Sequence, residues 1–406
     1  MPAGVAGFGR VLAAEGISNF GSMLSRLAIP WLAALQLQAT PLQMAALLLA
    51  DVAAGAVGSL WLGRWVDRRG KRATMLLADG ARCVLLAGLG FAAWRGAAGF
   101  GLLVAVAAAS GLLTMAFELA RSAWMAQRVQ AAELPRRNAQ LSIAGSVSEA
   151  AAFALGGWLY QGLGVALSLL VDGLSYAASA LCLRGVAETP AAASVESASG
   201  WRGQWHEALA GWRAIAERPA LRAVVGVEAL LAFGAAASGT SYMLFVSREL
   251  GLSTGVLGLV FALGAVGSAA GAAAAPAIGR RLGAGRAMAG GLAVMALGWA
   301  CVPLAGSVGW AAAWLITQQM VGDAGHTLLD VHDRSLRQTA VPPALLARAD
   351  AGIRSAGQLA TIAGALAGGL LGTAFGLRTV LWAAVACVAA ASLLAAWRLG
   401  RRDTPV

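Results

Sequence analysis

Apolar runs of about 20 residues, each followed by a short charged or Pro/Gly-containing break, repeat along the chain. A helix of that length spans the hydrocarbon core of a bilayer. The runs are continuous rather than alternating, and only 12% of the residues are charged while 59% are hydrophobic. These features exclude a soluble globular domain and a membrane β-barrel. The sequence therefore predicts an all-α integral membrane protein.

The positions of the breaks predict twelve transmembrane helices. We expect them at about 11–36, 41–63, 73–94, 99–122, 139–161, 165–186, 221–246, 254–279, 286–304, 308–331, 351–374 and 378–398. The first run is too long for a signal peptide, so we expect it to remain as the first membrane helix.

The longest polar interval divides these helices into six and six. We predict an N-terminal six-helix bundle at 1–186, a cytoplasmic linker at 187–219 and a C-terminal six-helix bundle at 220–406. Apolar linker side chains at helical spacing predict an amphipathic helix in the membrane interface. They are Trp201, Trp205, Leu209, Trp212 and Ile215. We favour a tether between the halves, without a separate activity, as the role of this linker.

Basic residues predict the orientation of the chain. Of the 30 Lys and Arg residues, 25 fall on the side of the N-terminus, three fall on the other side and two lie within helices. Because short cytoplasmic loops retain basic residues, both termini are expected in the cytoplasm. The basic residues behind the net charge of +11 lie between the apolar runs, and this position argues against a nucleic-acid partner. All basic residues except Lys71 are arginine, and together with much Ala and Gly this indicates a GC-rich bacterial genome. Because a membrane β-barrel is excluded, we expect the protein in the bacterial inner membrane.

A weak internal repeat supports the six-plus-six division. A shift of 212 residues superposes glycines of the two halves, namely Gly145 on Gly357, Gly156 and Gly157 on Gly368 and Gly369, and Gly164 on Gly376. The repeat predicts two pseudo-symmetric bundles, an arrangement that is common in transporters.

The segment 63–72 reads Gly-Arg-Trp-Val-Asp-Arg-Arg-Gly-Lys-Arg and follows the second predicted helix. It resembles the signature loop of the major facilitator superfamily, a family of membrane transporters. Within that superfamily the chain resembles the drug-exporter branch, which includes macrolide-efflux and enterobactin-export proteins. Three further passages carry this resemblance, and they lie at 77–82, 171–176 and 335–342.

The chemistry of this segment predicts a polar latch at the cytoplasmic face. Gly63 and Gly70 permit a close helix approach and a tight turn, and Asp67 can face a helix N-terminus or an arginine. Asp79 and Arg82 are expected to form a structural pair with the latch. The remaining gate residues can bind acidic groups or lipid headgroups, and they are Arg68, Lys71 and Arg72. Alternatively the basic residues only set the topology, which leaves Asp67 unexplained.

Charged residues in the middle of predicted helices are candidates for proton coupling, because each costs about 2.5–3.5 kcal/mol there and normally faces the bundle or water. The candidates are Glu149 and Asp51, near the middle of their helices, and Glu228, in the first third of its helix. Glu149 is favoured over Asp51, because its alanine-rich neighbours offer neither donor nor cation and so favour a protonated carboxyl. The superfamily resemblance implies that helix 6 lies outside the cavity. Asp172 is therefore interpreted as a packing residue.

Candidates for a substrate cavity combine charged and aromatic side chains. They are Arg26, Trp31, Phe233, Tyr242, Asp323 and His326. Arg26 is a counter-charge to one carboxylate, a contact for an anionic substrate, or one partner of a structural pair. The aromatic residues have packing as their alternative role. Asp323 and His326 are too few ligands for a metal site, and we expect neither a metal nor a cofactor.

The leading hypothesis is a secondary-active transporter that exports a small amphipathic molecule by proton exchange and alternating access. Its partners would be the substrate, protons and membrane lipids, and we expect a monomer. No phosphate-binding loop, zinc-protease pair or nucleophile elbow occurs, so we expect no enzymatic activity. The alternatives are a nutrient symporter or importer, a lysophospholipid flippase and, last, an intramembrane enzyme.

Overall fold

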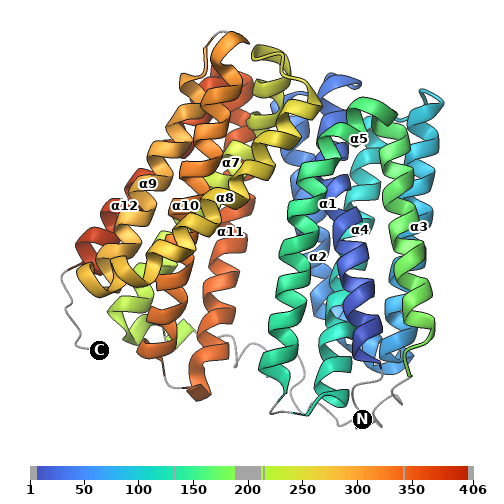
Figure 1. Cartoon of the computed structure of the whole chain (residues 1–406), viewed down its shortest axis with the longest axis horizontal. Helices are drawn as coiled ribbons and strands as arrows, with labels where there is room; N and C mark the ends of the chain where they lie inside the picture. Colours follow the sequence, from blue (N-terminus) through green and yellow to red (C-terminus); the bar gives the residue numbers. More distant parts are fainter. Residues whose placement is uncertain are drawn as a thin grey trace. The chain divides into compact units, whose positions relative to one another are not determined.

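The computed structural model describes residues 7–130, 133–187, 212–213, 215–306, 308–341 and 343–400. These residues form helices and no β-strand (Figure 1). The chain separates into two compact units. One unit comprises Met1–Ala39, Ala46–Val195 and Ser253–Leu259, and the other comprises Thr40–Ala45, Glu196–Leu252 and Val260–Val406. The all-α fold predicted from the sequence is therefore confirmed.

The helices of the first half are long. They are α1 (Phe8–Leu35), α2 (Pro41–Arg69), α3 (Lys71–Trp94), α4 (Phe100–Arg128) and α5 (Leu134–Arg184). The 51-residue α5 holds two spans, because Gly164 within it has a non-helical backbone. The two spans correspond to the fifth and sixth predicted helices.

The second half contains the remaining helices. They are α7 (Pro219–Leu244), one π-helical turn (Phe245–Glu249), α8 (Thr254–Leu282), α9 (Ala284–Leu304), α10 (Val308–Ala340), α11 (Pro343–Phe375) and α12 (Leu377–Arg398). With α5 taken as two spans, the described residues thus form the twelve predicted helices. By length and composition alone, eight candidate membrane spans occur among the described helices.

The internal repeat is visible in the backbone. Gly164, between the two spans of α5, has φ 76° and ψ 167°. Its counterpart Gly376, between α11 and α12, has φ 86° and ψ 163°. Positive φ of this kind is readily adopted only by glycine. The two halves therefore use the same glycine conformation at the same point of the repeat.

Each unit has its own apolar core. In the N-terminal unit, buried residues of α1, α3 and α4 meet the end of α5, as Val11, Met75, Trp124 and Leu183 illustrate. In the C-terminal unit, the corresponding core joins α7, α9, α10, α11 and α12. Ile215, at the end of the predicted linker, belongs to this second core and is 3% exposed. Trp201, Trp205 and Leu209 lie outside the described residues.

Glycines also set the distance between α8 and α10. Gly264, Gly267 and Gly271 occupy one buried face of α8. A Cβ atom on Gly267 would lie 2.8 Å from the carbonyl carbon and Cα of Met320, and one on Gly271 would meet the backbone of Ala324. Small residues therefore allow the two backbones to approach closely.

Replacing Gly267 with alanine is expected to destabilise the C-terminal unit by about 1–3 kcal/mol, because the helices must separate to admit one methyl group. Gly290 on α9 is a matched control, since a Cβ there meets no atom of the described residues within 4 Å. Gly290→Ala is expected to be neutral or to stabilise by about 0.5–1 kcal/mol through helix propensity. Unfolding of the purified variants in detergent measures both changes. Equal effects of the two substitutions would contradict the close approach.

Candidate functional site

The segment that resembles the superfamily signature joins α2 to α3. α2 remains helical through Arg69, so the predicted loop from Gly63 to Arg72 is wrong in extent. The connection consists of Gly70, which has φ 90° and precedes the first residue of α3. Helix-compatible residues continue α2 until Gly70, where only glycine readily adopts the required backbone. Gly63 therefore lies within a helix, and the side chain of Asp67 lies outside the described residues.

The basic residues of this segment have different environments. Arg68 is exposed, whereas Lys71 is fully buried and cannot present its ammonium to a lipid headgroup. Arg72 donates hydrogen bonds to the carbonyls of Leu183 at 3.2 Å and Arg184 at 2.5 Å, at the end of α5. A cation is favourable at a helix C-terminus, where carbonyls lack partners within the helix. Arg72 thus fixes the start of α3 to the end of α5.

A second arginine reaches the same helix end. Arg10 of α1 donates a hydrogen bond to the carbonyl of Gly185, which caps α5. On the neighbouring helix, Trp124 of α4 donates from its indole nitrogen to the carbonyl of Ala187 at 3.4 Å. Three helices therefore hold the end of α5 and the residues that follow it through backbone carbonyls. The arrangement stabilises the end of the bundle that the basic residues predict to be cytoplasmic.

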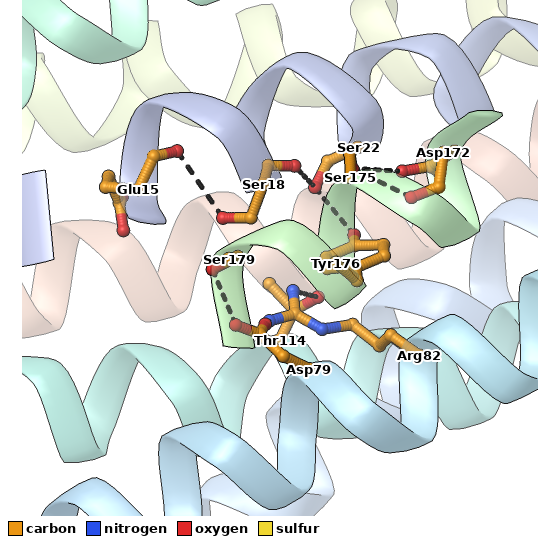
Figure 2. Close-up of polar contacts among 10 residues, drawn as sticks. All are labelled: Glu15, Ser18, Ser22, Asp79, Arg82, Thr114, Asp172, Ser175, Tyr176 and Ser179. Atoms are coloured by element: carbon orange, nitrogen blue, oxygen red, sulfur yellow. Dashed lines mark hydrogen bonds and ion pairs between the residues drawn. The ribbon is translucent and has the colours of Figure 1, made fainter. Parts of the chain in front are cut away.

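Asp79 and Arg82 form a buried pair inside the N-terminal unit (Figure 2). An Arg82 terminal nitrogen lies 2.5 Å from Asp79 Oδ1, and Ser179 donates to Asp79 Oδ2 at 2.6 Å. Asp79 is 0% exposed and Arg82 is 3% exposed. A buried carboxylate requires a paired cation and hydrogen-bond donors, and both are present here.

Aromatic rings enclose the guanidinium of Arg82. Its central carbon lies 4.2 Å from the ring centroid of Tyr176 and 5.0 Å from that of Phe117, both within cation–π range. The Tyr176 hydroxyl lies 2.7 Å from the Ser22 hydroxyl, which extends the network to α1 (Figure 2). The charged pair is predicted from the sequence, but these partners are not, because they come from helices distant in the chain.

Asp172 occupies a separate, fully buried position on the second span of α5. It accepts hydrogen bonds from Ser25 of α1 and, at 3.2 Å, from Ser175. Gly21 is its close neighbour on α1, because a Cβ atom there would meet the side chains of Asp172 and Ser175. Asp172 therefore joins α1 to α5, a position that agrees with its interpretation as a packing residue.

Three charged candidates lie on the outside of the N-terminal unit. Arg26 of α1, Asp51 of α2 and Glu149 of α5 are all exposed. The Arg26 guanidinium interacts electrostatically with the Asp51 carboxylate. Glu149 has no hydrogen-bond or ion-pair partner among the described residues. Because a lipid-facing charge at mid-helix is costly, each of these exposed positions is suited to contact with water.

The other candidates from the N-terminal half and from α7 are placed differently. Trp31 is buried in α1 and is 4% exposed, so its ring is not available to a ligand. Phe233 of α7 is half-buried, and its backbone packs against Gly364 of α11. Glu228 of α7 lines a cavity with residues of α10 and α11.

Two predicted cavity residues of the C-terminal unit lie near one another. The Tyr242 hydroxyl of α7 is buried, has no hydrogen-bond partner among the described residues and interacts electrostatically with Asp323 of α10. Asp323 accepts a hydrogen bond from Gln319 at 2.9 Å. Phe261 of α8 lies beside Tyr242, with ring centroids 6.2 Å apart. Gln319 and Phe261 were not identified from the sequence, because neither carries a charge nor belongs to a motif.

His326 is exposed one turn beyond Asp323. Within the described part of the chain, no group of three or more His, Cys, Asp or Glu residues is arranged to hold a metal ion.

The sequence matches the model of the Major Facilitator Superfamily over residues 11–330, which is most of the chain. The chain belongs to the Major Facilitator Superfamily. As a superfamily member it is a multi-pass membrane transporter, and transporters of this kind are not enzymes in general. No curated protein matches it.

Solved structures agree with the superfamily fold. The chain is similar to the nucleoside transporter NupG, with 12% identity, a TM-score of 0.75 and coverage of 97% of this chain and 98% of that chain. It is similar to a bacterial homologue of the iron transporter ferroportin, with 16% identity, a TM-score of 0.73 and coverage of 97% and 98%. A bacterial homologue of the human lysosomal transporter Spinster gives 14% identity, a TM-score of 0.72 and coverage of 100% of both chains. At these identities the likeness shows the fold.

Proposed function

We propose that this transporter exports a small amphipathic molecule in exchange for protons, by alternating access in a bacterial inner membrane. The observation that carries the proposal is the distribution of charge on the outside of the N-terminal unit. Arg26 and Asp51 interact electrostatically, whereas Glu149 has no partner among the described residues. A mid-helix carboxyl group without a counter-charge is a candidate for proton coupling, because a charge at that depth normally has a functional role.

The resemblance of the three passages at 77–82, 171–176 and 335–342 to drug exporters supports the outward direction. Among the similar structures, one is named for nucleosides and another is a homologue of a transporter named for iron, so they support no single substrate for this chain. The electrostatic partner of Arg26 reduces its value as a phosphate contact, which disfavours a lysophospholipid flippase. A nutrient symporter remains the competing function, and the direction of transport distinguishes it.

Accumulation of labelled compounds tests the proposal. A panel of amphipathic drugs and siderophores is supplied to cells with and without the protein, in the presence and absence of an uncoupler. Export predicts lower accumulation in cells that make the protein, and the uncoupler removes the difference. Higher accumulation would indicate an importer, and a chemically changed compound would indicate an enzyme.

A further inference from the structure

A charged cavity lies within the C-terminal unit, between α7, α10 and α11. Its volume is about 460 Å³, which is within the range of small-molecule sites. Six charged side chains line it, and they are Glu228, Asp330, Arg334, Arg337, Asp350 and Arg354. The cavity lies near the end of α10 and the start of α11, where the basic residues predict the cytoplasmic face.

Four of these side chains are paired with one another. Arg334 lies 2.9 Å from Asp330 on the same helix. Arg337 lies 3.4 Å from Asp350 of α11 and also contacts Asp333, which is 7% exposed. These pairs satisfy most of the charge along α10.

Glu228 and Arg354 have no such partner. Within the described ranges, neither forms a hydrogen bond or an ion pair. The Glu228 side chain lies beside Gly357, with Cγ and one carboxylate oxygen each 3.5 Å from where a Cβ atom would be. Arg354 precedes Gly357 by three residues and therefore lies on the same face of α11. The cavity thus presents one uncompensated group of each sign.

We propose that this cavity binds a zwitterion that carries an ammonium group and a phosphate or carboxylate group. The Arg354 guanidinium donates to the anionic group, for which its planar set of donors is suited. The Glu228 carboxylate accepts from the ammonium group. Two sources share this chemistry, namely the headgroup of an ethanolamine lipid and a soluble zwitterion such as an amino acid. This binding site is a proposal separate from proton-coupled export, because binding of a zwitterion to the cavity requires no proton gradient.

Calorimetric binding to the purified, delipidated full chain in non-ionic detergent tests the site. The probes are glycerophosphoethanolamine, which carries both charges, and glycerol 3-phosphate, which lacks the ammonium. Arg354→Gln is expected to lower the affinity for both probes by about tenfold or more, because a charge-assisted hydrogen bond is lost. Glu228→Gln is expected to lower the affinity for glycerophosphoethanolamine to the same extent and to leave the affinity for glycerol 3-phosphate unchanged.

Arg222→Gln provides the matched control, because Arg222 is exposed on α7 and does not line the cavity. It should bind both probes as the unmodified chain does. Arg354→Lys, which keeps the charge, should retain part of the affinity and so guards against a folding defect in Arg354→Gln. Absence of binding at about 10 mM glycerophosphoethanolamine, or an equal effect of Glu228→Gln on both probes, would overturn the proposal.

Reconstitution distinguishes the two sources. In nanodiscs of phosphatidylethanolamine, a lipid occupant competes and weakens binding of glycerophosphoethanolamine relative to nanodiscs of phosphatidylcholine. Equal binding in both nanodiscs assigns the cavity to a soluble zwitterion. Both results support the site and differ only in its occupant. Neither result depends on transport, so failure of the export proposal leaves this test unaffected.

Discussion

Glu149→Gln is expected to abolish uphill efflux while leaving substrate binding and downhill exchange largely intact. Glutamine keeps the shape of a protonated glutamate but cannot release a proton. In the structure Glu149 is exposed at the middle of the first span of α5 and has no partner among the described residues. Its replacement should therefore remove coupling without breaking a contact that holds the bundle together.

Proteoliposomes with an imposed pH gradient measure this effect. The substrate is a compound identified by the accumulation assay, and counterflow without a gradient reports downhill exchange. Glu133→Gln is a suitable control, because Glu133 precedes α5 and pairs with Arg137 at 3.1 Å, away from the middle of the span. If Glu149→Gln pumps at the unmodified rate, Glu149 is a structural carboxylate. Asp51 is then the next residue to test.

The sequence predicted the helices well because their signal is local. Apolar length identified every described span, and Gly164 and Gly376 marked corresponding breaks in the two halves. Helix ends were less accurate. α10 continues to Ala340, beyond the predicted end at 331, because the charged residues after the apolar run are still compatible with a helix. The length of an apolar run reflects the thickness of the membrane and not the full length of the helix.

The candidate sites could be predicted only in part. Asp79 and Arg82 are three residues apart, so their pairing is visible in a helix pattern. The Ser179 donor is 100 residues from Asp79, and its position depends on how α3 packs against α5. The cavity lined by Glu228 and Arg354 depends in the same way on three helices. The pattern of a single sequence does not show which distant helices pack together.

Asp79→Asn is expected to lower the free energy of unfolding of the N-terminal unit by about 3–5 kcal/mol, as breaking one side of a buried ion pair does. Arginine stays charged, so Arg82 would keep a buried charge whose contacting carboxylate is lost. In the part of the chain that the structure describes, the buried Nε atom of Arg82 already has no hydrogen-bond partner. The cation–π contacts with Tyr176 and Phe117 stabilise the charged guanidinium only in part.

Unfolding of the purified protein in mixed micelles, followed by tryptophan fluorescence, measures the loss. Asp330→Asn is the matched control, because the pair of Asp330 and Arg334 has side chains 42% and 71% exposed and should contribute about 0–1 kcal/mol. The double variant Asp79→Leu with Arg82→Met removes both charges and should recover much of the stability, since apolar replacement of a buried pair is often neutral. If Asp79→Asn costs no more than Asp330→Asn, the buried pair does not stabilise the bundle. If the double variant is as unstable as Asp79→Asn, an uncompensated Arg82 charge is not the cause of the lost stability. The loss then comes from packing and hydrogen bonds, and Ser179 is the first partner to examine.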